Sequence, residues 1–570
     1  MIVAMALSAL VAALGMVTML GARGRRRPGP TTSDFLVASR GVTPLWNASA
    51  ISGEYISAAA FLGTAGLVLA YGTDMLWLPV GAVAGYVLLL AFVTAPLRRS
   101  GAYSMSDFAE WRLGSFAVRR IVTACVCFIG WFYLLPQFQG AGVTLRVLTG
   151  APVWAGWLVV VAVVLALVLS GGMRSITAVQ AVQFWVKLLA VAVPAIALLA
   201  VWRLDDPGDP AADRPPVFER ATTVQVHAEA AVKVTAATPV TVRGRLDGVD
   251  RDGTELMLTA GPHVVGEKSE LVFPAGAGVP HVERLPVQDG VTWATPFGRG
   301  AGHELYSAYS GMIGVLLGTV GLPHILMRFY TNTCGRAARR TAAMVPVLLS
   351  LFYVFPALYG AMGRLYTPEL LMTGDTDATI LMLPQRLVPG MVGALLSGLI
   401  AAGAFAAFIS TSCGIVVAIA GTTSQSLLLR GGIGAFRLGA VFALAVPLTV
   451  VWRVGPQGAA GLVTLALTVS ACSLCPLLLL GIWWRGLTPA GAGAGLVVGG
   501  GLAVIAGVVG LFVGPGGGWT GAMLTRPALV IVPVAFAVMV AVSLLTRRTV
   551  PRRADRAMAR LHLPEEIVIR

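Results

Sequence analysis

The segment Ile51-Ser-Gly-Glu-Tyr-Ile-Ser-Ala58 places two hydroxyls, a glycine and a carboxylate in the middle of an apolar run, residues 47–71. A charged residue at the centre of a membrane helix costs about 2.5–3.5 kcal/mol on insertion scales, which favours a functional role for Glu54. A glutamate at the edge of a loop is the alternative, but Glu54 lies eight residues beyond Trp46. Gly53 weakens the helix, and Ser57 can satisfy backbone groups that an unwound segment leaves free. The segment predicts a membrane helix interrupted near its middle.

The composition of the whole chain is that of a polytopic membrane protein. Of its 570 residues 56% are hydrophobic and only 12% are charged, with a mean hydropathy of +0.81. Soluble proteins are typically about 25% charged. Runs such as Leu158–Leu169 and Ala528–Leu545 fit the apolar stretch of about 20 residues that crosses a bilayer as a helix. The 68 glycines are typical of closely packed membrane helices.

Two other functional classes are disfavoured. The net charge of +15 includes only three lysines, and the arginines cluster at the ends of apolar runs, so no basic stripe for nucleic acid is present. The sequence contains no zinc motif, Gly-x-Ser-x-Gly motif, P-loop or paired catalytic carboxylates. We therefore expect neither a nucleic-acid-binding protein nor an enzyme, and we assign no catalytic residue.

The apolar runs predict about 13 membrane spans. They cover residues 2–21, 47–71, 77–96, 121–143, 154–171, 184–201, 304–327, 343–363, 388–416, 438–452, 459–483, 490–514 and 527–546. The first run has an uncharged start and is followed by Arg23-Gly-Arg-Arg-Arg27, which favours a helix over a signal peptide.

The arginines and lysines predict an orientation. One set of alternate connecting segments carries 26 of them and the other set carries 7. The richer set includes residues 97–120, 173–187, 328–342 and 547–570. Because cytoplasmic loops are enriched in these residues, we expect an outside N-terminus and a cytoplasmic C-terminus, in a bacterial plasma membrane.

Residues 205–298 differ from the rest of the chain because they hold 14 of the 26 acidic residues. The runs starting at Thr223 and Val240 alternate apolar and polar residues, as half-buried strands do. We expect Asp250-Arg-Asp-Gly253 to be the hairpin turn between two strands. The segment predicts a small extracytoplasmic β module between the sixth and seventh spans, and its partner could lie in the cell envelope.

Neither of two candidate metal sites is convincing. His227, His263 and His281 of the insert lie 36 and 18 residues apart without a cysteine partner, so solvated surface histidines are the better interpretation. Cys472-x-x-Cys475 has no second pair and lies in an apolar segment, where buried thiols usually pack as small hydrophobic groups. We predict no metal other than sodium, for the reasons that follow.

Several motifs resemble the sodium:solute symporter family. They are Ser33-Asp-Phe-Leu-Val-Ala-Ser-Arg40, Gly171-Gly-Met-Arg-Ser-Ile-Thr177 with Gln183, and Gly321-Leu-Pro-His-Ile-Leu-Met-Arg-Phe-Tyr330. The last motif, with Ser52-Gly-Glu-Tyr-Ile-Ser-Ala-Ala-Ala-Phe-Leu-Gly63, is most similar to the cation–acetate (monocarboxylate) branch. The resemblance covers roughly residues 30–550 without the 205–298 insert. It implies an all-α fold of two inverted five-helix repeats, like the sodium–leucine transporter, whose first helices are broken at the substrate site.

This fold divides the chain into six parts. They are an extra N-terminal transmembrane helix (1–21), the first inverted repeat (47–201), the extracytoplasmic β-rich insert (202–303), the second inverted repeat (304–483), two C-terminal transmembrane helices (490–546) and a basic cytoplasmic tail (547–570).

The resemblance also implies a sodium site. In Ala407-Phe-Ile-Ser-Thr-Ser412, Ser410 and Thr411 would supply hydroxyls and Ala407 its carbonyl. The carbonyls of Gly53 and Ile56 would complete the oxygen ligands that a hard cation prefers. Alternatively, both hydroxyls bond only to their own helix, as is common in membranes. The matched motifs favour sodium, with a proton as the other coupling ion considered.

The substrate site is expected at the same break. A half-helix N-terminus attracts an anion because its free N–H groups carry about half a positive charge. The candidates for substrate binding are Glu54, Ser57, Ala58 and Gln137. For His324 and Arg328 we expect a structural or gating role.

These features together predict a secondary transporter that takes up a small monocarboxylate, such as acetate, propionate or pyruvate, with sodium by alternating access. A sodium symporter for proline or a sugar is the first alternative. A transporter-like sensor is the second, although the tail Arg547–Arg570 contains no signalling domain. The expected partners are the carboxylate substrate and the lipid bilayer.

Overall fold

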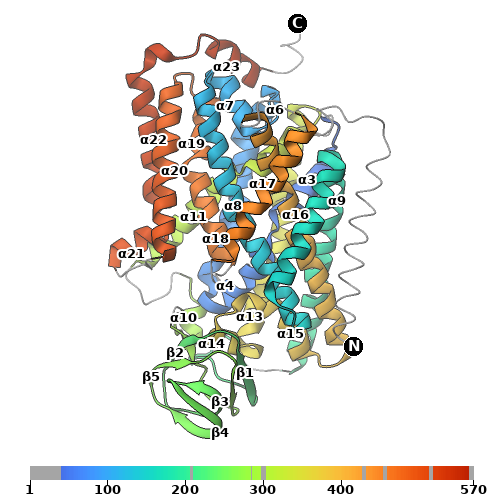
Figure 1. Ribbon diagram of the computed structural model, residues 1–570, viewed down its shortest axis with the longest axis vertical. Coiled ribbons are helices and arrows are strands. Elements are labelled where there is room, and N and C mark those ends of the chain that lie inside the picture. The colour runs from blue at the N-terminus through green and yellow to red at the C-terminus, as the bar shows by residue number, and fades with distance from the viewer. Residues whose placement is uncertain are drawn as a thin grey trace.

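The computed structural model describes residues 40–205, 209–283, 285–296, 303–426, 432–453, 459–512 and 518–563. The predicted span 2–21 and most of the Ser33–Arg40 motif lie outside these residues. Long helices run side by side, and a small β sheet covers one end of them (Figure 1).

The helices before the insert correspond to the predicted first repeat. They are α3 (Pro44–Tyr55), a π-helical turn (Ala59–Gly63), α4 (Thr64–Tyr71), a 3-10 turn (Gly72–Leu76), α5 (Trp77–Leu88), a second π-helical turn (Leu89–Val93), α6 (Thr94–Ser100), α7 (Met105–Leu113), α8 (Phe116–Thr149) and α9 (Val153–Asp205). The long element α9 contains two predicted spans, whose apolar parts are Val153–Leu169 and Ser175–Leu204.

The remaining helices follow the insert. They are α11 (Glu304–Gly321), α12 (Pro323–Phe329), α13 (Gly335–Tyr366), α14 (Glu369–Thr373), a 3-10 turn (Thr376–Ala378), α15 (Thr379–Leu387), α16 (Met391–Ser426), α17 (Ile433–Val451), α18 (Ala459–Cys472), α19 (Leu474–Trp483), α20 (Pro489–Phe512), α21 (Gly518–Thr525), α22 (Ala528–Leu545), a 3-10 turn (Arg547–Thr549) and α23 (Ala554–His562). Every predicted span within the described residues falls on helix. By length and apolarity nine described helices could cross a membrane, or ten with the bent pair α11–α12.

Two helices are broken inside the membrane part. The helix α3 ends at Tyr55, and Ile56 leaves the helical region with ψ of 88° before helix resumes beyond Ser57. The helices α11 and α12 meet at an angle of 45° around Leu322, whose ψ is 115°. Pro323 explains the second break, because proline lacks an N–H and pushes the preceding residue into extended backbone. The predicted interruption in the segment 51–58 is therefore confirmed.

The broken helices pack closely on other helices through glycine. A Cβ at Gly53 of α3 would lie 2.5 Å from the carbonyl oxygen of Gln180 in α9. A Cβ at Gly318 of α11 would collide with the carbonyl oxygen of Leu467 in α18. The first helix of each repeat thus meets the last helix of the same repeat backbone to backbone, as small residues allow in membranes.

The insert forms the predicted β module. Its strands are β1 (Thr222–Val226), β2 (Ala230–Val234), β3 (Thr238–Leu246), β4 (Val249–Leu258), β5 (Gly261–Val265), β6 (Ser269–Phe273) and β7 (His281–Val282). They form one antiparallel sheet in the order β1-β6-β3-β5-β2-β7, with β4 paired to β3.

The predicted hairpin turn at 250–253 is wrong, because these residues lie within β4. The turn is Asp247-Gly248, where both residues have positive φ, 51° and 82°. These angles suit the two-residue hairpin turn that Asp-Gly favours. Residues 240–258 contain two Asp-Gly pairs, and the pairing of Leu246 with Val249 places the turn at the first.

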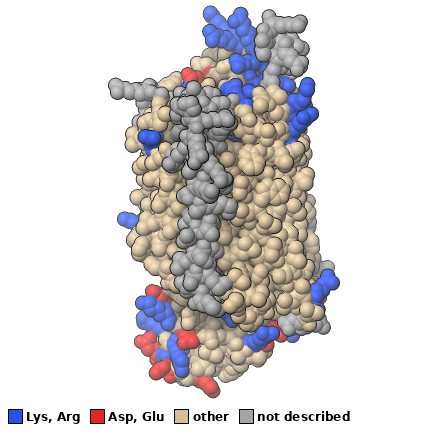
Figure 2. Space-filling model, turned by 90° about the vertical axis from the view of Figure 1, so that its right-hand side faces the viewer, with Lys and Arg blue, Asp and Glu red and all other residues tan. Residues whose placement is uncertain are grey.

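The charged side chains lie mainly at the two ends of the molecule, and the visible face between them is largely uncharged (Figure 2). At the end opposite the sheet, Arg99 in the last turn of α6 donates to the carbonyl of Leu561 in α23 at 3.2 Å. There Arg485 also pairs with Asp555 of α23 at 2.7 Å. Segments predicted to be cytoplasmic therefore share one end, and the insert covers the other. Which end faces the cytoplasm stays a prediction.

Candidate functional site

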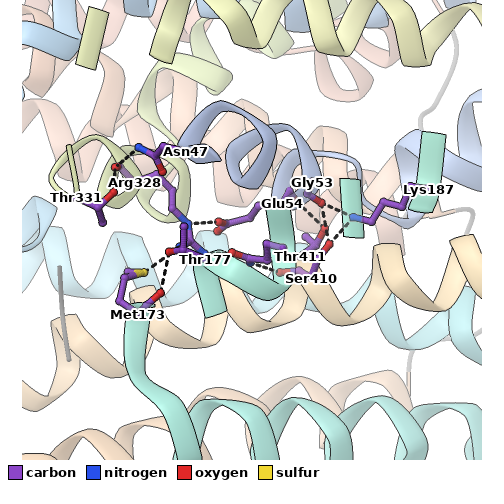
Figure 3. A network of polar contacts seen from close by, with 11 residues as sticks. Asn47, Gly53, Glu54, Met173, Thr177, Lys187, Arg328, Thr331, Ser410 and Thr411 are labelled. Carbon is purple, nitrogen blue, oxygen red and sulfur yellow. Dashed lines mark hydrogen bonds and ion pairs between the residues drawn. The ribbon is translucent and has the colours of Figure 1, made fainter. Parts of the chain in front are cut away.

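The break in α3 exposes carbonyl oxygens that face the hydroxyls of α16 (Figure 3). Ser410 donates to the carbonyl of Gly53 at 2.7 Å, and Thr411 donates to the carbonyl of Glu54 at 2.6 Å. The Thr411 oxygen also lies 3.4 Å from the carbonyl oxygen of Ile56. The hydroxyls therefore reach a partner helix, as the sodium interpretation requires.

The five predicted sodium ligands thus lie in one cluster. The Ser410 hydroxyl lies 3.2 Å from the carbonyl oxygen of Ala407, which places the fifth oxygen beside the other four. The contact between Ser410 and Ala407 is within α16, as the alternative interpretation expects. The hydrogen bond from Ser410 to the Gly53 carbonyl, however, reaches a different helix, α3. An oxygen cluster of this kind suits a monovalent hard cation.

A lysine from α9 reaches the same oxygens. The Lys187 ammonium donates to the carbonyls of Gly53 and Ile56, the latter at 3.1 Å, and to the hydroxyl of Ser410. The side chain is completely buried. Figure 3 shows it approaching the cluster from the side opposite Glu54.

Lys187 was not among the predicted site residues. Although it falls within the predicted span 184–201, its charge was counted in the cytoplasmic segment 173–187. That placement is wrong, since Lys187 lies inside α9, within the span Ser175–Leu204. The signal was available: Lys187 is one of three lysines in the chain and adjoins an apolar run. An ionisable residue within a membrane segment marks a functional site by default.

The Glu54 carboxylate is bound by Arg328 of α12. Arg328 Nε donates to Glu54 Oε2 at 2.5 Å, and both side chains are buried. The predicted substrate ligand Glu54 is therefore engaged by a cation from the second broken helix. The guanidinium also donates to Thr177 Oγ1 at 2.7 Å and to the amide oxygen of Gln180, both in α9.

The ion pair and the oxygen cluster are connected through Gln180, whose amide nitrogen donates to the Ser410 carbonyl at 2.6 Å. The structural or gating role expected for Arg328 and His324 stays a prediction. His324 is buried, with its ring 5.2 Å from that of Tyr133. Thr177 belongs to the quoted motif Gly171–Thr177, whereas Gln180 was not identified from the sequence.

The substrate candidates other than Glu54 lie on the other side of the break. The backbone N–H of Ala58 donates to Gln137 Oε1 at 3.0 Å, and Gln137 Nε2 donates to the carbonyl of Tyr133 at 3.2 Å. The structure therefore brings Ala58 and Gln137 together, and the amide that could hold an anion is bound by a side-chain oxygen.

A cavity of about 60 Å³ adjoins Ser57. Its polar lining comes from Tyr55, Ser57, Thr64, Tyr133, Tyr353 and Thr464, and the remaining walls are apolar. It lies between the two repeats, since Tyr55 and Tyr133 belong to the first repeat and Tyr353 to the second. A volume of this size holds roughly five water molecules, or one small solute.

The insert histidines form no metal cluster within the described residues. His227 is exposed, and His263 forms an ion pair with Asp247 at 2.7 Å. The interpretation as a solvated histidine is wrong for His281, which is 2% exposed and bonds to the carbonyl of Val279 at 2.9 Å. Burial lowers the pKa of His281 to about 4, and the positive charge of Arg364 acts in the same direction.

Comparison with known proteins identifies the family of the chain. The profile of the sodium:solute symporter family matches residues 35–204 and 287–499, more than half of the chain. The chain belongs to the sodium:solute symporter family. It is therefore a sodium-coupled solute symporter and not an enzyme, and the insert strands lie in the gap between the two matched segments.

Curated relatives are similar over nearly their whole length. An uncharacterized symporter of Cupriavidus necator is 28% identical, with 91% of this chain and 88% of that protein covered. A monocarboxylic acid transporter of Corynebacterium glutamicum is 26% identical, with 90% and 86% covered.

Solved structures show the same fold. A Na⁺-coupled sialic acid symporter in a substrate-bound outward-open state has a TM-score of 0.62 at 13% identity, covering 93% of this chain and 97% of that chain. MHP1, a nucleobase-cation-symport-1 family transporter, has a TM-score of 0.51 at 12% identity, covering 93% and 99%. The predicted fold, a multi-pass helical membrane protein like the sodium–leucine transporter, is confirmed.

Proposed function

We propose that this symporter carries a small monocarboxylate, such as acetate, propionate or pyruvate, into a bacterial cell together with sodium. The observation that carries the proposal is the cavity of about 60 Å³ beside the α3 break. Hydroxyl-bearing residues line it beside the broken helix, an environment that suits a small anionic solute. The relative named as a monocarboxylic acid transporter supports the same class.

The substrate carboxylate is proposed to bind at Ser57 and Ala58. The Ala58 amide lies at the start of the helical segment beyond the break, where N–H groups carry partial positive charge. Its present acceptor, Gln137 Oε1, would turn away so that the carboxylate takes its place. The hydroxyls of Tyr133 and Tyr353 line the cavity and could orient the solute.

Sodium is proposed to bind the carbonyls of Gly53, Ile56 and Ala407 and the hydroxyls of Ser410 and Thr411. Because the same broken helix would bear both ligands, occupancy of one site changes the energy of the other. Such coupling is reciprocal for binding free energies. Alternating access would then move the two repeats around a fixed site.

The test is uptake of radiolabelled acetate, pyruvate, propionate, proline and glucose into vesicles, with an inward sodium gradient and with potassium in its place. Uptake of the monocarboxylates only, stimulated by sodium, is the expected result. Sodium-stimulated uptake of proline or glucose would instead identify another solute class. Failure to transport any of the five would favour a sensor.

A further inference from the structure

Lys187 is a buried cation whose recorded polar partners are all neutral oxygens. Its three N–H donors are used by two carbonyls of the α3 break and by the Ser410 hydroxyl. The nearby carboxylate of Glu54 is held by Arg328. Within the described residues Lys187 forms no ion pair. A buried charge is costly unless it is paired or fully bonded, so these oxygens are what makes its position tolerable.

The oxygens that bind Lys187 are also predicted sodium ligands. Gly53, Ile56 and Ser410 contribute to both sets, and only Ala407 and Thr411 of the sodium set are not bonded to the ammonium. Sodium and an ammonium group each carry one positive charge and seek several oxygens. In a site of low dielectric, two such charges sharing three ligands repel strongly. They cannot occupy the cluster together.

We propose that the Lys187 ammonium and a sodium ion are alternative occupants of one site, so that sodium displaces a cation belonging to the protein. The proposal rests on the sodium site of the proposed function. The ammonium bridges α3 and α16 just as the ion would, because its oxygens come from both helices. It holds these helices together in the sodium-free state.

The packing of α9 makes this contact possible. Gly53 has no side chain, so α9 approaches α3 until the Gln180 carbonyl lies 2.5 Å from the position of a Cβ. Lys187 follows Gln180 by seven residues, two helical turns along the same face. Its side chain therefore passes beside α3 and reaches the carbonyls at the break.

The consequence is a weakened apparent affinity for sodium. When a competitor occupies a site, the apparent Kd of the ligand equals its intrinsic Kd divided by the fraction of molecules whose site is free. If the ammonium occupies the site nine-tenths of the time, its removal should tighten sodium binding about tenfold.

The experiment measures binding of radiolabelled sodium to the purified symporter without solute, at constant ionic strength maintained with choline. Lys187→Met keeps a side chain of similar length without charge, and Lys187→Gln is a second variant that keeps a donor to the carbonyls. Both should bind sodium about tenfold more tightly than the wild type. Adding Ser410→Ala to Lys187→Met should abolish the gain. Lys233→Met, in strand β2 of the insert, is the matched control and should bind as the wild type does.

Unchanged or weaker sodium binding in both Lys187 variants would overturn the proposal, because the lysine would then shape the site rather than compete for it. No sodium binding in any variant would overturn it as well. Because the assay contains no solute, a wrong substrate class leaves its result unaffected. Conversely, if Lys187 does not compete with sodium, the proposed sodium-driven uptake is not contradicted.

Discussion

Glu54 and Arg328 are 274 residues apart in the sequence, yet their side chains meet at 2.5 Å with exposed fractions of 0% and 1%. Glu54 precedes the break in α3, and Arg328 lies in α12, beyond the break at Leu322. The pair therefore connects the first helices of the two repeats. In alternating access these repeats move relative to each other, so the pair is placed to limit or guide that motion.

Breaking this pair should destabilise the protein. Arg328→Met leaves the Glu54 carboxylate buried without a partner, which costs about 3–5 kcal/mol for pairs of this kind. The unfolding temperature of the purified protein should fall markedly. Adding Glu54→Gln should restore much of it, because the unpaired charge is removed. Glu54→Gln alone should reduce uptake even at saturating sodium. Unfolding temperatures equal to that of the wild type in all three variants would show that the ion pair does not stabilise the folded protein.

The hydroxyls of α16 give a second prediction. Thr411→Ala removes a proposed sodium ligand that does not contact Lys187, so half-saturation by sodium should shift to higher concentration. Substrate affinity at low sodium should fall with it and recover in part at saturating sodium, because coupling is reciprocal. Ser410→Ala should also weaken sodium activation, by less if the loss of a Lys187 ligand offsets part of the effect.

The control for these variants is Thr423→Ala, since Thr423 is in the same helix but bonds to the carbonyl of Ile419 at 2.7 Å. The measurement is the sodium activation curve of uptake. Curves for Ser410→Ala and Thr411→Ala that overlay the control would place the sodium site elsewhere.

Features of the site with a local cause can be predicted from the sequence, whereas contacts between residues far apart in the chain cannot. The interruption near Gly53 was predictable because its cause is local: a glycine, two serines and a carboxylate within eight residues. The hydroxyl pair on α16 was predictable only through its resemblance to a known motif. The partner of Glu54 was not, because nothing near residue 54 indicates an arginine more than 270 positions away.

Lys187 and the hairpin turn show a second limit. The charge of Lys187 was counted in the cytoplasmic segment 173–187, whereas the residue lies inside α9 and oxygens of α3 and α16 accept its hydrogen bonds. Between residues 240 and 258 of the insert, two Asp-Gly pairs favour a turn equally on local grounds. Only the register of the paired strands decides between them, and register depends on burial across the whole sheet.

The membrane orientation is testable by cysteine labelling. Ala117, in the first turn of α8, and Thr254, in the insert, are both exposed. In a Cys334→Ser background, Ala117→Cys should react with a membrane-impermeant maleimide only in inside-out vesicles. Thr254→Cys should react only in right-side-out vesicles. Reaction of both from the same side would reject the topology, and reversed reactivity would reject the orientation.

The buried histidine of the insert predicts a pH dependence. The folded protein favours neutral His281, because burial lowers the pKa of its imidazole from the ordinary value of 6.5 to about 4. Its contribution to stability is therefore complete above pH 6.5 and is lost as the pH falls toward 4, about 2 kcal/mol of it by pH 5. Hydrogen-exchange protection factors in β2 and β7, which pair at Lys233 and His281, should decrease over this range.

Two variants isolate the effect of His281. In His281→Gln, which cannot titrate, the decrease in protection should disappear. His227→Gln is the matched control, because His227 is exposed in the same insert, and it should behave as the wild type. Equal pH dependence in His281→Gln and the wild type would assign the effect to another group.

The insert as a whole is predicted to be dispensable for translocation, but the structure limits how much can be removed. Its helix α10 (Gly290–Ala294) carries Trp293, whose indole N–H donates to the Val68 carbonyl of α4 at 2.8 Å. The Arg364 guanidinium lies over the same ring, 5.2 Å from its centre, and donates to the Gln288 carbonyl at 2.8 Å. These contacts join the end of the insert to both repeats.

Two deletions separate the sheet from this attachment. Replacing residues 209–286 by a flexible Gly/Ser linker keeps Gln288 and Trp293 and should leave uptake measurable, with a moderately lower unfolding temperature because Leu370 and Met372 lose apolar neighbours from the sheet. Replacing 205–298 also removes the bonds that satisfy the last carbonyls of α4, which costs about 1–3 kcal/mol for each group left unsatisfied. That variant should be less stable and transport less. In the full chain, Trp293→Ala should reproduce most of the difference. Loss of all uptake in the shorter deletion, with membrane insertion intact, would show instead that the sheet takes part in transport.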